Sequence, residues 1–352
     1  MGNLIRYSAL SAKISAMKSR FLTEEQFANL ASQESVTAAV EYLKNLPAYG
    51  EAFAQADIQS LHRAQVEQLL FLSLYRDFSS LYKFAGVKQR AFLDLYFTHF
   101  EHDLLKKCLR NAAFSRESQL DFRKYEDFFQ RHSKLDLIGL SKAASISEFI
   151  NGLEGSFYYE PLKALEESGN ATLFSCSVAL DNAYFLNFWK RQKQTLGRDE
   201  KNCLEKCLGE KIDLLNLQSI ARAVQNYGLT GAQILDFLVP INYHISPRQE
   251  KALSEAASEE DFARILKDTW YGDRISRTRE RLSGQEAGSK RIYRELLEQL
   301  YSSSSRKNPY SAAILNAYFY FKEEEIRKIT TAVEGIRYGL DQNAILSCMA
   351  DN

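Results

Sequence analysis

The chain has 352 residues, of which 45% are hydrophobic and 26% are charged, as in an ordinary soluble protein. Lysine plus arginine and aspartate plus glutamate number 45 each, so no net charge attracts the protein to nucleic acid or to an anionic membrane. With only 5 prolines and 16 glycines, the sequence contains few helix breakers, which favours an all-α fold.

The sequence predicts neither a membrane-spanning helix nor a secretory signal. No apolar run approaches the roughly 18 residues that a membrane-spanning helix needs, and residues 1–6 lack the long apolar run of a secretory signal. The five cysteines contain no Cys-x-x-Cys pair and fall mostly among apolar helical positions, as buried thiols in a reducing compartment do. We therefore expect a cytoplasmic protein without direct membrane insertion, whose membrane contact goes through another protein.

The predicted helices, in chain order, begin with residues 6–21 and continue with one that opens at Thr23, where Thr-Glu-Glu-Gln forms a capping box. Longer helical patterns cover residues 58–82, 87–110, 171–194, 286–301 and 310–337. Pro309 stands where a helix-start proline is expected, and polar loops are predicted at 197–201 and 302–308.

A block of leucine, serine and tyrosine occurs three times. Its copies run from Leu30 through Ser35 and Leu43 to Tyr49, from Leu140 through Ser145 and Leu153 to Tyr158, and from Leu253 through Ser258 and Leu266 to Tyr271. Each serine precedes an amphipathic turn and is predicted to be a helix N-cap. In the second and third copies an acid three residues later, Glu148 or Asp261, is the expected capping-box partner.

A second block repeats with nearly the same period. Glu101, Asp213 and Glu325 are evenly spaced, since 213 − 101 = 112 and 325 − 213 = 112. In each copy the positions four, seven and eight residues after the acid are apolar and form one stripe on a helix. The two blocks together predict three helical repeats of about 112 residues, at 1–115, 116–228 and 229–352.

The acid-bearing helices also carry a family resemblance. The run Asp213-Leu-Leu-Asn-Leu, followed by Arg222, and the run that begins Lys322-Glu-Glu-Glu-Ile resemble helices of the C-subunit family of V-type and A-type ATPases, whose eukaryotic member is the d subunit. This resemblance implies a funnel of three similar helical domains about a pseudo-threefold axis. It also implies a non-catalytic central-rotor protein that couples the D and F subunits of the central stalk to the membrane proteolipid ring.

In such an assembly, torque links ATP hydrolysis or synthesis to the transport of ions such as protons, on the cytoplasmic face of the membrane. The chain itself has no Walker loop, no GxGxxG and no GxSxG motif, so neither a cofactor nor a catalytic site is expected in it.

Eight residues are candidates for partner contacts: Glu101, Asp213, Glu325, Arg110, Arg222, Lys190, Arg191 and Lys193. The three acids could line one rim of the funnel and meet a basic stalk. The favoured alternative is that each is a solvent-facing or helix-start residue, stabilised by the helix dipole or by Arg110 and Arg222. The basic run at 190–193 is read mainly as a solvated face, with a partner contact as the alternative.

One histidine pair could suggest a metal. His99 and His102 are three residues apart and could share a helix face. Because there is no HExxH motif and no Glu-x-x-His pair, surface polarity is the favoured interpretation and no metal is expected.

Two other functions compete with the rotor protein. A free-standing helical scaffold that docks partner helices would be an elongated superhelix, but repeats of about 112 residues are too long for the common solenoids. An all-α enzyme of the isoprenoid type would need aspartate-rich metal motifs, and the sequence has none.

Overall fold

The computed structural model describes residues 2–54, 56–57, 61, 63–114, 125–226, 228–282 and 288–351. Every regular element in these ranges is an α-helix, so the predicted all-α class is confirmed for the described part of the chain. None of these helices combines the length and the apolar character needed to cross a bilayer. The chain divides into two compact units, a first unit of Met1–Arg90 with Glu298–Asn352 and a second unit of Ala91–Leu297.

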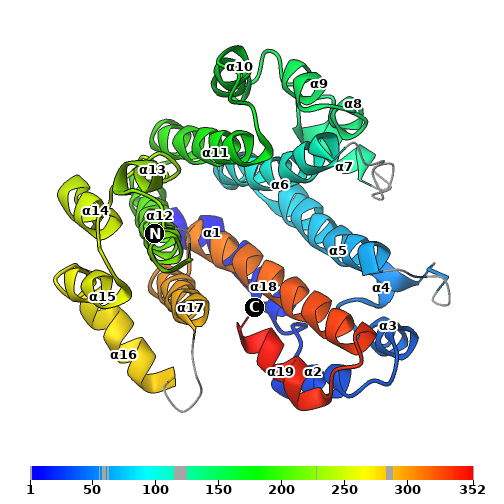
Figure 1. The fold of residues 1–352 in the computed structure, drawn as a ribbon. Coiled ribbons are helices and arrows are strands. Elements are labelled where there is room, and N and C mark those ends of the chain that lie inside the picture. The colour runs from blue at the N-terminus through cyan, green and yellow to red at the C-terminus, as the bar shows by residue number, and fades with distance from the viewer. Residues whose placement is uncertain are drawn as a thin grey trace. The chain divides into compact units, whose positions relative to one another are not determined.

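The first unit is built around one buried helix. Its elements are α1 (Gly2–Lys18), α2 (Glu24–Ala31), α3 (Val36–Lys44), α4 (Gly50–Phe53), α5 (Arg63–Phe84), the end of α17 (Ser289–Lys307), α18 (Ala313–Arg337) and α19 (Gln342–Asp351). The central helix α18 contacts α1, α2, α3, α5 and α19 (Figure 1). Its first half is apolar on nearly every face, and a helix of that kind is stable only when it is surrounded.

The second unit contains the remaining helices. They are most of α6 (Val87–Ala113), α7 (Glu126–His132), α8 (Leu137–Ser141), α9 (Ile146–Asn151), α10 (Tyr159–Glu167), α11 (Leu173–Thr195), α12 (Arg198–Asn226), α13 (Gly231–Leu235), α14 (Pro247–Ser254), α15 (Glu259–Lys267) and α16 (Gly272–Leu282). A hydrophobic core joins the C-terminal half of α12 to the helices that follow it, with Leu217 and Ile220 packed in one cluster with Leu253 and Phe262.

The three serine N-caps are confirmed. Their hydroxyls accept hydrogen bonds from the backbone N–H groups of Ala38, Glu148 and Asp261, respectively. A capping box would have Glu148 and Asp261 accept from the backbone N–H of the capping serine. They accept instead from the N–H groups of Ala144 and Ala257, the residues directly before the two serines. The complete capping box predicted at Thr23 and Gln26 is present.

The same order of elements follows each capping serine. A short helix (α3, α9 or α15) ends before a tyrosine, and a further helix (α4, α10 or α16) begins directly after that tyrosine. All three tyrosines, Tyr49, Tyr158 and Tyr271, have 0% of their surface exposed. The recurring block therefore ends each time on a large, fully buried side chain.

The loop predicted at 302–308 and one helix start are wrong, and the loop predicted at 197–201 is confirmed only at Gly197. Residues 302–307 continue α17, because serine hydroxyls such as those of Ser303 and Ser305 donate to backbone carbonyls of the preceding turn and so remain compatible with a helix. Helix α12 already begins at Arg198. Helix α18 begins at Ala313, after a turn in which the Ser311 hydroxyl donates to the Asn308 carbonyl and accepts from the Ala313 N–H.

Candidate functional site

The three evenly spaced acids lie in the interior of long helices and are buried. Glu101 on α6 is 7% exposed, Asp213 on α12 is 2% exposed and Glu325 on α18 is 5% exposed. The favoured interpretation of solvent-facing or helix-start acids is therefore wrong. A buried carboxylate needs hydrogen-bond donors, and each acid has them.

Glu325 is held by the N-terminal part of the chain. Its Oε1 atom accepts from the Leu22 N–H at 2.6 Å, and its Oε2 atom accepts from the Tyr49 hydroxyl at 2.7 Å. Lys322 donates at 2.8 Å both to Glu325 Oε2 and to the Tyr49 hydroxyl. These four residues, the Glu325 cluster, tie the chain entering α2 and the chain entering α4 to the central helix.

The ion pair in the Glu325 cluster is almost fully dehydrated. The Lys322 and Glu325 side chains are 3% and 4% exposed, and the Lys322 ammonium lies 4.1 Å from the centroid of the Tyr49 ring. Burial, and then the Glu325 charge, raise the pKa of Tyr49 well above its usual value. The phenol therefore keeps its proton and remains a hydrogen-bond donor at any physiological pH.

Asp213 binds a different segment in the same manner. Its Oδ1 atom accepts from the Tyr243 N–H at 3.1 Å, and its Oδ2 atom accepts from the N–H groups of His244 at 2.6 Å and Ile245 at 3.3 Å. The Tyr271 hydroxyl donates to Oδ2 at 3.0 Å. Burial raises the pKa of Asp213, and these four donors oppose that shift because they stabilise the carboxylate. We call this group the Asp213 cluster.

The third group, the Glu101 cluster, is built differently. The Ser133 hydroxyl donates to Glu101 Oε1, and the Leu135 N–H donates to the Ser133 oxygen at 3.0 Å. Burial raises the pKa of Glu101, and the Ser133 hydrogen bond and the Arg191 charge oppose the shift. Tyr158 occupies the position of Tyr49 and Tyr271, but its buried hydroxyl has no hydrogen-bond partner among the described residues.

The three clusters share one pattern. Each acid accepts a hydrogen bond from the segment that leads into a short helix, which is α2 for Glu325, α8 for Glu101 and α14 for Asp213. Glu325 and Asp213 also accept from the tyrosine that follows α3 or α15. The sequence showed both signals separately, the spaced acids and the buried tyrosines. It did not show that Tyr49 pairs with Glu325, because the two residues are 276 positions apart.

We expect the three equivalent tyrosines to respond differently to removal of the hydroxyl. Tyr49→Phe and Tyr271→Phe each leave a buried carboxylate short of a donor and are expected to lower the free energy of unfolding by about 1–3 kcal/mol. Tyr158→Phe removes a hydroxyl that makes no hydrogen bond with a described residue, so it is expected to be neutral or slightly stabilising. Urea unfolding of the three variants measures this, and equal losses at all three positions would contradict the assignment.

The basic candidates lie mostly at the surface. Arg110, Arg222, Lys190 and Lys193 are exposed, whereas Arg191 is half-buried and its charge acts on Glu101. Lys193 pairs with Glu205 at 3.2 Å and lies 4.5 Å from the Trp189 ring. Neither Arg110 nor Arg222 stabilises the acids through a described contact.

The histidine pair belongs to a polar contact between helices. His102 Nε2 lies 2.9 Å from Asp181 Oδ1, and the His102 ring stacks on Tyr184 with centroids 4.6 Å apart. Lys106 donates to both oxygens of Asp181 at 2.8 Å. In the described ranges, no three histidine, cysteine, aspartate or glutamate side chains come together as metal ligands.

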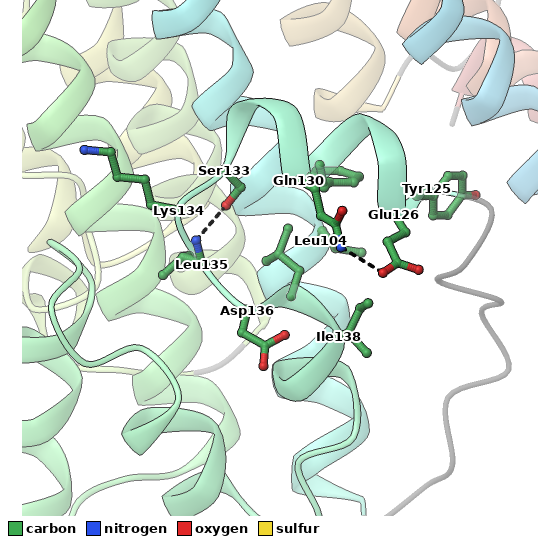
Figure 2. Close-up of a pocket in the computed structure, with 11 residues that line it drawn as sticks. Leu104, Tyr125, Glu126, Gln130, Ser133, Lys134, Leu135, Asp136 and Ile138 are labelled. Carbon is green, nitrogen blue, oxygen red and sulfur yellow. Dashed lines mark hydrogen bonds between the residues drawn. The ribbon is translucent and has the colours of Figure 1, made fainter.

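A pocket of about 310 Å³ lies beside the Glu101 cluster, between α6, α7 and α8 (Figure 2). Its polar side chains already serve the fold. The Gln130 amide donates to Glu126 at 2.8 Å, Asp136 accepts from the Gly139 N–H at 2.9 Å, and Ser133 bridges Leu135 to Glu101. The lining offers no convergent set of polar groups that would orient a substrate, in contrast to a ligand site.

Comparison with known proteins places the chain in one family. The model of the ATP synthase (C/AC39) subunit family matches residues 10–348. The C subunit of the A-type ATP synthase from Thermococcus kodakarensis is 26% identical over 96% of this chain and 89% of its own length. Proteins of the same name from Pyrococcus abyssi, 24% identical over 96% and 89%, and from Methanothermobacter thermautotrophicus, 23% identical over 93% and 83%, are also similar.

The match extends over nearly the whole chain, including the three recurring serines and tyrosines and all three buried acids. The chain belongs to the ATP synthase (C/AC39) subunit family, a family of non-catalytic subunits of rotary ATPases, and it is not itself an enzyme.

Proposed function

We propose that the chain is the central-rotor protein that couples the stalk of an A-type or V-type ATPase to its membrane ring. It would bind the D and F subunits of the stalk on one side and the proteolipid ring on the other, on the cytoplasmic face of the membrane. Torque through this protein would then link ATP hydrolysis or synthesis to ion transport. The observation that carries the proposal is the family match over residues 10–348.

We further propose that the chain folds as three helical repeats, at about 1–115, 116–228 and 229–352, arranged as a funnel about a pseudo-threefold axis. The three acid clusters support this arrangement, because each binds an equivalent segment through an equivalent residue. In this scheme the N-terminal block completes the cluster of the last acid, Glu325. The chain would thereby close on itself as a ring of three units does.

The construction of the clusters suits a part that transmits force. Side-chain clusters in which every polar group is paired hold their elements in one arrangement, and breaking them exposes unpaired buried groups. In the Glu325 cluster, Leu22, Tyr49 and Lys322 all bind the same carboxylate of the central helix. Load applied to the N-terminal helices would therefore be passed directly to α18.

The acids and the bases have separate roles in this proposal. Glu101, Asp213 and Glu325 hold helices together from inside, so a partner protein cannot reach them without local unfolding. The exposed bases Arg110, Arg222, Lys190 and Lys193 remain as partner-contact candidates, and Arg191 is the least accessible of the basic run.

We expect a tagged chain to co-purify with the D and F subunits of the stalk and with the proteolipid ring. If the basic run binds an acidic surface of a partner, the charge reversal Lys190→Glu with Lys193→Glu places like charges in contact. We therefore expect it to weaken retention of that partner by at least about tenfold at low salt. Lys142→Glu with Lys267→Glu, at exposed positions elsewhere in the second unit, is the matched control. A properly folded tagged chain that retains neither the stalk nor the ring would refute the proposed function.

A further inference from the structure

The turn between α5 and α6 lies against the first helix. The Gln89 side-chain amide donates to the Arg6 carbonyl at 2.8 Å, and the Lys13 ammonium lies 5.1 Å from the centroid of the Phe84 ring. These contacts bring the first turns of α1, the end of α5 and the start of α6 into one surface. We call it the basic apolar surface. Its residues are Leu4, Ile5, Arg6, Lys13, Lys83, Phe84, Val87 and Lys88.

Four large apolar side chains of this surface point into solvent. Leu4 is 49% exposed, Ile5 75%, Phe84 51% and Val87 86%. Single exposed apolar residues are normal on a soluble protein, but a group of them on one surface indicates a site that something covers.

In the two sequence segments that form this surface, every charged residue is basic. Residues 2–20 contain four basic residues and no acid, and residues 82–90 contain three basic residues and no acid. Since the whole chain has a net charge of zero, this excess is local and is balanced elsewhere. Arg90 is held by the Tyr82 carbonyl, whereas Lys83 and Lys88 are exposed.

Basic residues also lie near the turns of two other pairs of long helices, although Asp199 and Glu200 follow directly in the second of them. The turn between α17 and α18 carries Arg306 and Lys307 beside Tyr310, which is 40% exposed. The turn between α11 and α12 follows the basic run at 190–193 and is followed by the exposed Arg198. Basic residues therefore recur beside turns between long helices, although the protein as a whole carries no net charge.

We propose that the basic apolar surface binds the headgroup layer of a bilayer that contains anionic phospholipid. In this arrangement Lys83 and Lys88 contact the lipid phosphates, and Ile5 and Val87 enter the boundary between headgroups and acyl chains, as on interfacial helices. Protein interfaces instead carry hydrogen-bonding residues of both charges around a well-packed centre, and the eight residues of this surface include no acid.

The inference goes beyond the proposed function, because lipid binding would be a property of this chain alone. It adds a direct headgroup contact to the membrane contact expected through other proteins of the assembly. No segment needs to cross the bilayer for this contact to form.

The test is co-sedimentation of the purified full-length chain with lipid vesicles at low salt. We expect binding to phosphatidylcholine vesicles that contain a quarter phosphatidylglycerol, and much weaker binding to pure phosphatidylcholine. Lys83→Glu with Lys88→Glu should lower the partition coefficient by about tenfold or more, since each base near an anionic surface contributes appreciably. Ile5→Ser with Val87→Ser should also weaken binding, whereas the control Lys142→Glu with Lys267→Glu should bind like the wild type.

Three results would overturn the inference. These are the absence of any preference for anionic vesicles, unchanged binding of both surface variants, and an equal loss in the control. If the surface variants bind vesicles normally but no longer co-purify with the ring or stalk, the surface is a protein docking site and the lipid assignment is wrong. Far-ultraviolet circular dichroism confirms that each variant is folded. Retention of stalk and ring by the wild type is measured separately, so the proposed function can fail or hold independently.

Discussion

Replacing Glu325 by alanine is expected to lower the free energy of unfolding by about 3–5 kcal/mol, because it leaves the buried Lys322 ammonium without its counter-charge. The same change removes the acceptor of the Leu22 N–H and of the Tyr49 hydroxyl. Urea unfolding followed by circular dichroism measures the loss. Proteolysis near α2 and α3 should also become faster, since the segments flanking these helices lose their hydrogen bonds to α18.

Two further variants separate the buried ion pair from a general effect of charge. Glu334→Gln, which alters a partly exposed pair with Arg63 at 3.5 Å, is expected to cost less than about 1 kcal/mol. Lys322→Met with Glu325→Leu removes both buried charges and should be more stable than Glu325→Ala, since no uncompensated charge remains. If Glu325→Ala costs no more than Glu334→Gln, the Glu325 cluster does not hold the two parts of the first unit together.

Local features of this fold could be predicted from the sequence because their causes are local. Ser35, Ser145 and Ser258 cap their helices through hydrogen bonds that reach only three residues along the chain. The serine tract at 302–305 could not be predicted correctly, because its flexible composition gives no sign that α17 continues through it. Helix α19 is absent from the predicted helices, and its packing against α18 and α2 is a tertiary effect.

The role of the acids could have been recognised, at least in part. Phe97 and Leu105 lie four residues before and after Glu101, and Phe321 and Ile329 flank Glu325 in the same way. An acid between two apolar residues at this spacing lies on the buried stripe of its helix, not on the solvent side. The identity of the donors could not be predicted, because Leu22 and Tyr49 reach Glu325 only through the tertiary fold.

The three clusters also differ in how the carboxylate is satisfied. Glu325 has an ion-pair partner, Asp213 is bound mainly by backbone N–H groups, and Glu101 is bound through a serine hydroxyl. The three evenly spaced acids are thus satisfied by three different sets of donors. Because backbone donors cannot be replaced by another side chain, the loss of the Asp213 carboxylate should be the hardest to compensate.

Asp213→Ala is accordingly expected to lower the free energy of unfolding by about 3–5 kcal/mol. It leaves the partly buried N–H groups of residues 243 and 244, the buried Ile245 N–H and the buried Tyr271 hydroxyl without an acceptor. Asp213→Asn, which keeps one carbonyl acceptor, should fall between the wild type and the alanine variant. Hydrogen exchange should show faster exchange at residues 243–245 while amides of α18 stay protected. Asp236→Ala, at an exposed position of the same unit, is the control. If exchange at 243–245 is unchanged in Asp213→Ala, these amides are protected by something other than the carboxylate, and Asp213 does not anchor the segment that enters α14.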